Sequence, residues 1–187
     1  MKKKTTLIVL ALALAVFLMG ASVLYKTLTE SIDADQLATE ATEETEAELM
    51  QAPDFTVYDI DGNEVKLSDF FGKPIVVNFW ASWCGPCKME MPDFNEKYLE
   101  IGNEVTFLMV NMTDGSRETV DIASAFIAEQ GYTFPVYYDT ASSAASTYGV
   151  YSLPTTFFID ADGHAIAQAT GAIDASTLQR GIDMIAP

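Results

Sequence analysis

The sequence predicts one α/β domain with a central mixed sheet and helices on both of its faces. Continuous apolar runs rich in β-branched and aromatic residues, at 74–80 and 104–112, are typical of strands buried on both faces. Segments with helical spacing alternate with strand-like runs, and the chain closes with a hairpin and a helix over 154–185. This order implies a sheet that is covered on both sides. An apolar content of 49% is sufficient for a core of this kind.

The first 26 residues are predicted to lie outside this fold. Three lysines at positions 2–4 precede an uncharged run over 5–25, which is long enough to span a bilayer as a helix. The lysines favour the cytoplasmic side, so the rest of the chain would be exported. Small residues at 20–22 also fit a cleavable secretory signal. Residues 1–26 are therefore expected to be a membrane anchor or a signal segment, and both alternatives imply export.

An acidic stretch over 27–52 separates this segment from the domain. It carries eight acidic residues and no basic one, so like-charge repulsion favours an extended, solvated tether. The domain is expected to begin at Pro53 and to run over 53–187. The net charge of −17 argues against nucleic acid as a partner and against docking on anionic lipid.

Turn and capping signals order the first half of the domain. Asp61-Gly62 separates two short β-type runs and indicates a hairpin. Ser68 and Gly72 mark the ends of a short helical turn, and Pro92 predicts a kink inside a helix. The expected order is a hairpin over 55–67, a helical turn over 68–72, a strand over 74–80 and a helix over 88–101.

The second half follows the same logic. Gly131 ends a segment of helical spacing, the sequence ADGH separates two strands as a second hairpin, and Asp174 is a candidate N-cap. The expected order is a strand over 104–112, a helix over 117–130, a strand over 134–138, a short helix over 141–150, strands over 154–160 and 165–171, and a helix over 174–185.

The only two cysteines lie in the sequence WASWCGPCKME, at the junction of a strand and a helix. A helix that begins at Gly85-Pro86 places Cys84 at its N-terminus, where free amides and the helix dipole stabilise a thiolate. Proline is well suited to the first turn, because its missing N–H costs nothing there. Cys87 lies one turn further, within reach of a disulfide. We expect Cys84 to be the attacking, partly exposed sulfur and Cys87 the buried resolving one, in thiol–disulfide exchange.

Other uses of the cysteine pair are less well supported. Two thiols and one histidine cannot fill a four-ligand zinc site without carboxylates or a partner chain. A structural disulfide across two residues closes too short a loop to add much stability. A metal-delivery module that combines the pair with His164 or a methionine stays open, although His164 is expected to be a turn residue.

Two motifs resemble the thioredoxin superfamily. The sequence NFWASWCGPCKMEMP resembles its active site, and SLPTTFFID resembles its second landmark, a cis proline before a strand. The resemblance implies a thioredoxin-like fold in which Pro154 lies beside the two sulfurs and Leu153 offers its backbone to a substrate strand. It also implies a substrate-binding surface formed by Trp83, Gly85 and Pro86.

A longer match, over 53–187, points to a narrower group. The sequence DGNEVKLSDFFGKPIVVNFWASWC, the hydrophobic N-terminal segment and the extra helix–strand unit at 117–138 resemble the TlpA/ResA-like membrane-anchored thiol-disulfide oxidoreductases. The resemblance implies a monomer without a cofactor that reduces disulfides of exported client proteins, such as apocytochromes c. It also implies an electron donor in the membrane, of the CcdA/DsbD kind.

Two departures from the family patterns affect the mechanism. Asn78 stands where thioredoxins usually have a buried aspartate, whereas Glu90 stands where the ResA-like group has a glutamate. Glu90 is three residues past Cys87 on the same helix face, so a buried carboxylate there could accept the Cys87 proton. The ResA-like group often has glutamate between its cysteines, and Gly85-Pro86 leaves the choice of client open.

Two other redox functions stay open. An exported compartment is generally oxidising, so a thiol oxidase or isomerase is an alternative to a reductase. A peroxidase would need a threonine or serine three residues before its reactive cysteine and a proline upstream. Ala81 and Val77 occupy those positions, which argues against peroxide chemistry.

Overall fold

The computed structural model describes residues 38–39 and 50–186. Its strands are β1 Ala38–Thr39, β2 Thr56–Tyr58, β3 Glu64–Lys66, β4 Ile75–Trp80, β5 Thr106–Asn111, β6 Val136–Tyr138, β7 Thr155–Ile159 and β8 Ala165–Thr170. Its helices are the 3₁₀ helix η1 Leu67–Phe70 and the α-helices α2 Gly85–Ile101, α3 Val120–Gln130, α4 Ser143–Thr147 and α5 Ala175–Ile185.

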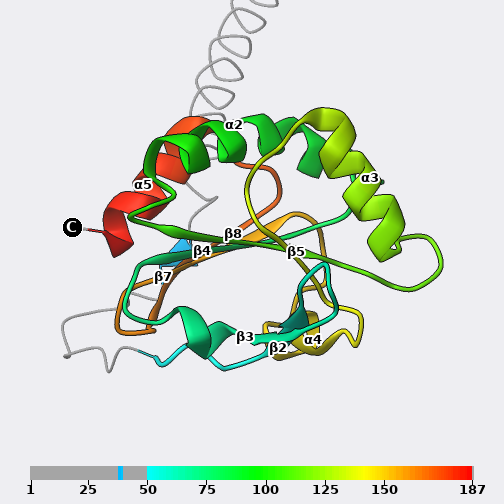
Figure 1. The fold of residues 1–187 in the computed structure, drawn as a ribbon. Helices are drawn as coiled ribbons and strands as arrows, with labels where there is room; N and C mark the ends of the chain where they lie inside the picture. The colour runs from blue at the N-terminus through cyan, green and yellow to red at the C-terminus, as the bar shows by residue number, and fades with distance from the viewer. Residues whose placement is uncertain (1–37, 40–49, 187) are drawn as a thin grey trace, which may run out of the picture. The chain divides into compact units, whose positions relative to one another are not determined.

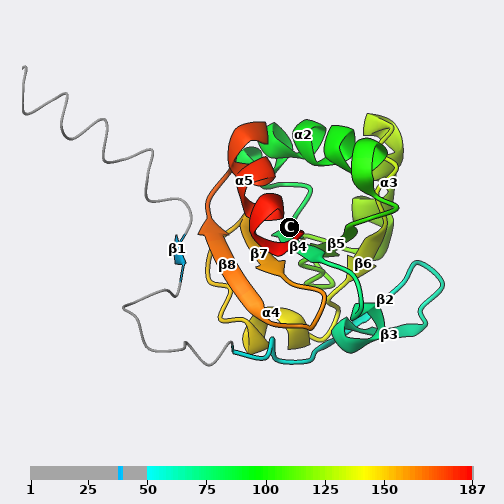
Figure 2. The same cartoon turned by 90° about the vertical axis from the view of Figure 1, so that its left-hand side faces the viewer.

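The strands form one mixed sheet in the order β1-β8-β7-β4-β5-β6-β2-β3. The central pairs β4–β5 and β5–β6 are parallel, whereas β4–β7, β7–β8, β2–β6 and β2–β3 are antiparallel. Helices α2, α3 and α5 lie over one face, and α4 lies on the other with the β2–β3 hairpin (Figures 1 and 2). The predicted mixed sheet with helices on both faces is confirmed.

Alternating residues of β4 divide the core between the two faces of the sheet. Val76 and Trp80 pack under α2 and α5, whereas Val77 and Phe79 pack on the side of α4, and all four are fully buried. Burial of each large side chain contributes about 1.5–3 kcal/mol. Asn78 is the one polar residue of this strand and lies on the face that α2 covers.

Every element expected within 53–187 is present, with small differences at the ends. Helix α3 begins at Val120 rather than at 117, because Thr119 is its N-cap and the residues before it form a loop. Ser68 does not cap η1 as predicted. It lies inside this helix, and its hydroxyl donates to Asp54 at 2.8 Å. The predicted N-cap of α5 is confirmed, since Asp174 accepts the N–H of Thr177 at 2.8 Å.

Residues immediately before Pro53 are also bonded to the domain. The N–H of Ala52 donates to the carbonyl of Gly163 at 2.8 Å, and the N–H of Ala165 donates to that of Met50 at 3.1 Å. Ala52 is also buried. Residues 50–52, which the sequence assigns to the tether, are therefore bonded to the turn before β8.

The N-terminal predictions fall mostly outside the described residues. The anchor or signal segment at 1–26 lies wholly outside them, and so does most of the acidic tether. Among residues 38–39 and 50–186, no helix has the length and apolar character that a bilayer span requires.

Candidate active site

The sheet brings three separate loops together at one end of its central strands. Parallel strands β4 and β5 end side by side, with Trp80 opposite Asn111. Strand β7 is antiparallel to β4 and begins at this same end, with Thr155 opposite Phe79. The loops after β4 and β5 and before β7 enclose a groove of about 450 Å³. It is lined by Trp83, Cys84, Gly85, Pro86, Met112, Asp114, Val150, Tyr151, Ser152 and Leu153.

Cys84 and Cys87 form a disulfide at the N-terminus of α2. Cys84 is the N-cap residue, and its sulfur accepts the N–H of Cys87 at 3.2 Å. Pro86 lies in the first turn, as predicted. Cys84 lines the groove but is only 4% exposed, less than the sequence analysis expects, and Cys87 is fully buried. Of the two sulfurs, that of Cys84 therefore lies at the groove and that of Cys87 lies in the core.

The predicted substrate-binding residues surround the groove, with one exception. Trp83 is 40% exposed, and Gly85, Pro86 and Leu153 line the groove beside it. The peptide bond between Leu153 and Pro154 is cis, as predicted. Pro154 itself is buried, and its carbonyl accepts the N–H of Gly171. Within the described part of the chain, the backbone of Leu153 forms no hydrogen bond, so it is free to pair with an extended segment.

Glu90 is a buried carboxylic acid on α2, with 1% of its surface exposed. One carboxylate oxygen accepts the side-chain N–H of Asn78 at 2.8 Å, and the other accepts the backbone N–H of Ile173 at 2.9 Å. Burial raises the pKa of Glu90 to about 7, against the opposing effect of these two donors. The group can therefore take up and release a proton near neutral pH.

Asn78 connects Glu90 to the sheet. Its amide nitrogen donates to Glu90 and to the hydroxyl of Thr156 at 3.0 Å, while its buried Oδ1 has no hydrogen-bond partner. A protonated Glu90 has an O–H to donate, and a rotated Asn78 amide would present Oδ1 to receive it. In place of the usual aspartate, Asn78 thus suits both protonation states of Glu90.

Several site residues escape the sequence analysis. Tyr151 is 97% exposed and lines the groove, and the guanidinium of Arg117 lies 3.9 Å from the centre of the Trp83 ring. Asp114 accepts the backbone N–H groups of residues 116–118, and these bonds, that of Glu118 first, lower the pKa of Asp114 to about 2. The available signal was position, because loops at the carboxyl ends of parallel strands often carry binding residues.

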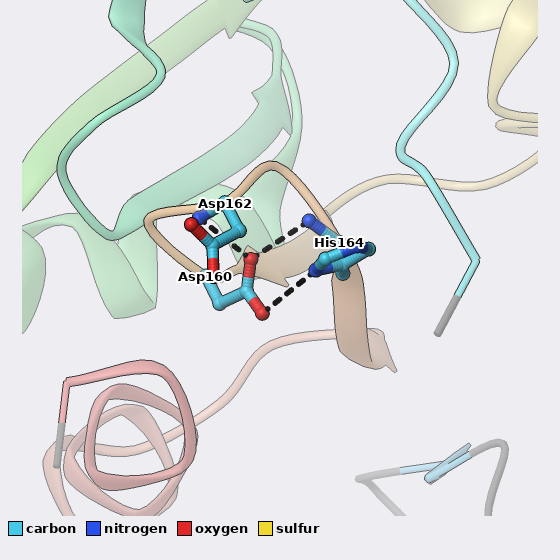
Figure 3. A group of neighbouring side chains, drawn as sticks. All are labelled: Asp160, Asp162 and His164. Atoms are coloured by element: carbon cyan, nitrogen blue, oxygen red, sulfur yellow. Dashed lines mark hydrogen bonds and ion pairs between the residues drawn. The ribbon is translucent and has the colours of Figure 1, made fainter. Parts of the chain in front are cut away.

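Asp160, Asp162 and His164 form a second polar cluster, in the turn between β7 and β8 (Figure 3). Asp160 accepts the backbone N–H groups of Asp162 at 3.0 Å and His164 at 2.8 Å, and its other oxygen lies 3.1 Å from the His164 ring. These bonds hold the turn, as predicted for His164. The turn follows Ile159, which lies opposite Ile75, at the other end of β4 from the cysteines. Five strand intervals correspond to roughly 16 Å, so the two sites are separate.

Replacing His164 by alanine is expected to leave the rate of thiol–disulfide exchange at the Cys84–Cys87 pair within about twofold of the unmodified protein. The reason is that His164 lies in a turn at the other end of the strands from the cysteines. The measurement is the rate of insulin disulfide reduction, with metal content determined on the reduced protein. A loss of both activity and bound metal would support the metal-delivery alternative.

Comparisons with known proteins agree with this geometry. Residues 50–168 match the AhpC/TSA family. The thiol-disulfide oxidoreductase ResA of Bacillus thuringiensis subsp. konkukian (strain 97-27) is 38% identical over 140 residues, which cover 73% of this chain and 78% of the relative. That of Geobacillus kaustophilus (strain HTA426) is 37% identical over 137 residues, which cover 73% and 76% of the two chains.

A solved structure of similar fold supports the same assignment. The exposed lipoprotein thioredoxin of Streptococcus pneumoniae strain TIGR4 superposes with a TM-score of 0.58 at 32% identity, covering 70% of this chain and 99% of the other. The thioredoxin-like fold is thereby confirmed, and the Cys84–Cys87 pair is the redox centre of a protein-disulfide oxidoreductase. The chain belongs to the AhpC/TSA family, as a relative of the ResA thiol-disulfide oxidoreductases.

Proposed function

We propose that this oxidoreductase works outside the cytoplasm and reduces disulfides of exported client proteins. The observation that carries the proposal is the arrangement around the pair: Cys84 caps α2 at an open groove, and buried Cys87 and buried Glu90 follow at three-residue intervals along the same helix. A thiol at the groove can attack a client, and a buried thiol beside a proton acceptor can complete the reaction.

The reaction begins on the reduced protein. The Cys84 thiolate attacks one sulfur of a client disulfide, the client S–S bond breaks, and one client thiolate leaves. The backbone of Leu153 seats the client as an added strand. Cys87 then gives its proton to Glu90 and attacks the Cys84 sulfur, which breaks the mixed disulfide and releases the second client thiolate. The client gains two electrons and, with protons from Glu90 and solvent, two thiols, and the protein ends with the Cys84–Cys87 disulfide.

The cellular setting is part of the same proposal. The uncharged run over 5–25 after three lysines supports an anchored or secreted domain on the outer side of the membrane. The similarity to an exposed lipoprotein thioredoxin is consistent with this side. Continued reduction there requires electrons from a membrane carrier of the CcdA/DsbD kind. Apocytochromes c are candidate clients, and the protein is proposed to act as a monomer.

The direction of electron flow can be tested by the reduction potential of the pair. A Gly-Pro dipeptide between the cysteines favours a value near that of thioredoxin, about −270 mV, rather than near about −120 mV, as in a strong oxidant. The measurement is an equilibrium titration of the purified domain against glutathione and dithiothreitol. A value near the oxidant end would reassign the protein as a thiol oxidase of exported proteins.

A further inference from the structure

Glu118 is a fully buried acidic residue that the reaction described above does not use. Its carboxylate accepts three hydrogen bonds: the backbone N–H of Ser82 at 2.8 Å, the Ser82 hydroxyl at 2.6 Å and the Asn111 side-chain amide at 2.7 Å. Ser82 precedes Cys84 by two residues, and Asn111 is the last residue of β5. Glu118 thus joins the active-site turn to the end of the neighbouring strand.

This turn fixes the position of the attacking sulfur. The N–H of Cys84 donates to the carbonyl of Ala81 at 3.1 Å, so residues 81–84 form one bonded turn. Cys84 must leave this turn in an extended conformation, with φ −79° and ψ 109°, to serve as the N-cap of α2. The hydrogen bonds of Ser82 itself go to Glu118, because its N–H and its hydroxyl both donate to that carboxylate.

The loop that carries Glu118 also reaches the wall of the groove. Asp114 accepts the N–H groups of Arg117 and Glu118 at 2.7 and 3.0 Å, which fixes the loop over these residues. The Arg117 guanidinium in turn stacks on Trp83. Arg117 and Glu118, two successive residues of one loop, therefore contact Trp83 and Ser82, the two residues before Cys84.

We propose that Glu118 is a positioning residue for disulfide exchange, which holds the 81–84 turn so that Cys84 caps α2 and Trp83 faces the client. Loss of its acceptors would leave the partly buried N–H of Ser82 without a partner. The turn would relax to recover that bond. The inference rests on the role of Cys84 as the attacking thiol.

The test is Glu118→Ala, read out by the pH dependence of Cys84 alkylation in the reduced protein and by client reduction. The alanine removes the acceptors of all three hydrogen bonds. Removal of a nearby negative charge would lower the pKa of Cys84, whereas loss of the N-cap geometry raises it. We expect a raised Cys84 pKa and a fall of about 10- to 100-fold in kcat/KM for client reduction.

Two further variants separate positioning from stability. In Glu118→Gln, the amide oxygen can accept from the Ser82 N–H and the Asn111 amide, and the N–H₂ group can donate to the Ser82 hydroxyl, so activity should stay close to that of the unmodified protein and the Cys84 pKa should not rise. Ser82→Ala removes one of the three bonds and should give a smaller effect in the same direction if Glu118→Ala does not fold. Glu129→Gln, an exposed acid at the end of α3, is the matched control and should match the unmodified protein.

The outcomes are distinct. An unchanged or lowered Cys84 pKa in Glu118→Ala, with reduced stability alone, would overturn the positioning role. An ordinary thiol pKa of about 8.5 for Cys84 in the unmodified protein would instead overturn its assignment as the attacking thiol, whatever the variant shows.

Discussion

Replacing Cys87 by serine is expected to convert the protein from a catalyst into a trap for its clients. Cys84 stays at the groove and still attacks, but no second thiol lies behind it to break the mixed disulfide. Turnover should fall by more than about 10³-fold, as for loss of a reacting group. The measurement is the yield of covalent adducts with a disulfide-bonded client, resolved by non-reducing electrophoresis and identified by mass spectrometry.

The matched control for this trap is Cys84→Ser, which keeps the buried thiol and removes the accessible one. It should form almost no adduct, because Cys87 is fully buried and does not line the groove. Equal trapping by the two variants would show that either sulfur can attack, and the order assigned here would be wrong. Clients recovered with Cys87→Ser would also test the proposal that apocytochromes c are among them.

Local sequence signals predict the centre of this site well. The cap at Cys84, the first-turn position of Pro86 and the cis bond before Pro154 depend on residues close together in the chain or on a recognised motif. The same holds for the fold, because buried strands and amphipathic helices are visible as local patterns. The elements differ from the expectation mainly at their ends, where capping bonds decide.

The contacts that Glu118 and Glu90 make could not be predicted from local sequence patterns. Glu118 meets Ser82 across 36 positions, and Glu90 meets Ile173 across 83. The first pair depends on the register of β4 against β5, and the second on the position of α2 against the segment between β8 and α5, neither of which a local periodicity encodes. An acid in a polar sequence such as GSRETV looks like an exposed loop residue, although Glu118 is fully buried. Burial of these acids is a property of the assembled sheet.

The burial of Glu90 and the number of its hydrogen-bond donors together set its strength as a base. An ionised carboxylate in the core is costly, and only two N–H donors, from Asn78 and Ile173, offset that cost. More donors would lower the pKa of Glu90 and make it a weaker base, whereas a buried carboxyl group without any donor would stay protonated. Two donors leave the pKa at about 7, where a proton acceptor for a thiol is most effective.

We expect the unmodified protein to show a pH dependence in both activity and stability, and replacing Glu90 by glutamine should remove it. As the pH rises through about 7, Glu90 becomes ionised and able to accept the Cys87 proton. The rate constant for client release should therefore rise over this interval. In Glu90→Gln the rise should disappear, with a loss of about 10²-fold or more at pH 8. Stopped-flow measurement of mixed-disulfide resolution, with Cys84 alkylation titrated separately, gives this profile.

The stability of the oxidised protein tests the same carboxyl group without its redox chemistry. Glu90 has a pKa of about 7 when folded and 4.5 as its ordinary value, so between these values the native state holds a proton that the unfolded state releases. The contribution of Glu90 to the free energy of unfolding therefore falls as the pH rises, by about 3 kcal/mol over the whole interval. Glutamine can keep both contacts, accepting from Ile173 and donating to the free Oδ1 of a rotated Asn78.

In urea unfolding, the free energy of unfolding of the unmodified protein should therefore fall by about 3 kcal/mol between pH 4.5 and pH 8, relative to that of Glu90→Gln. Glu96→Gln on the same helix is the control and should show no such difference between the two pH values. A constant difference between the unmodified protein and Glu90→Gln would mean that the carboxyl group titrates at its ordinary pKa. The acceptor of the Cys87 proton would then have to be solvent, and the buried acid at position 90 would have no part in the exchange reaction.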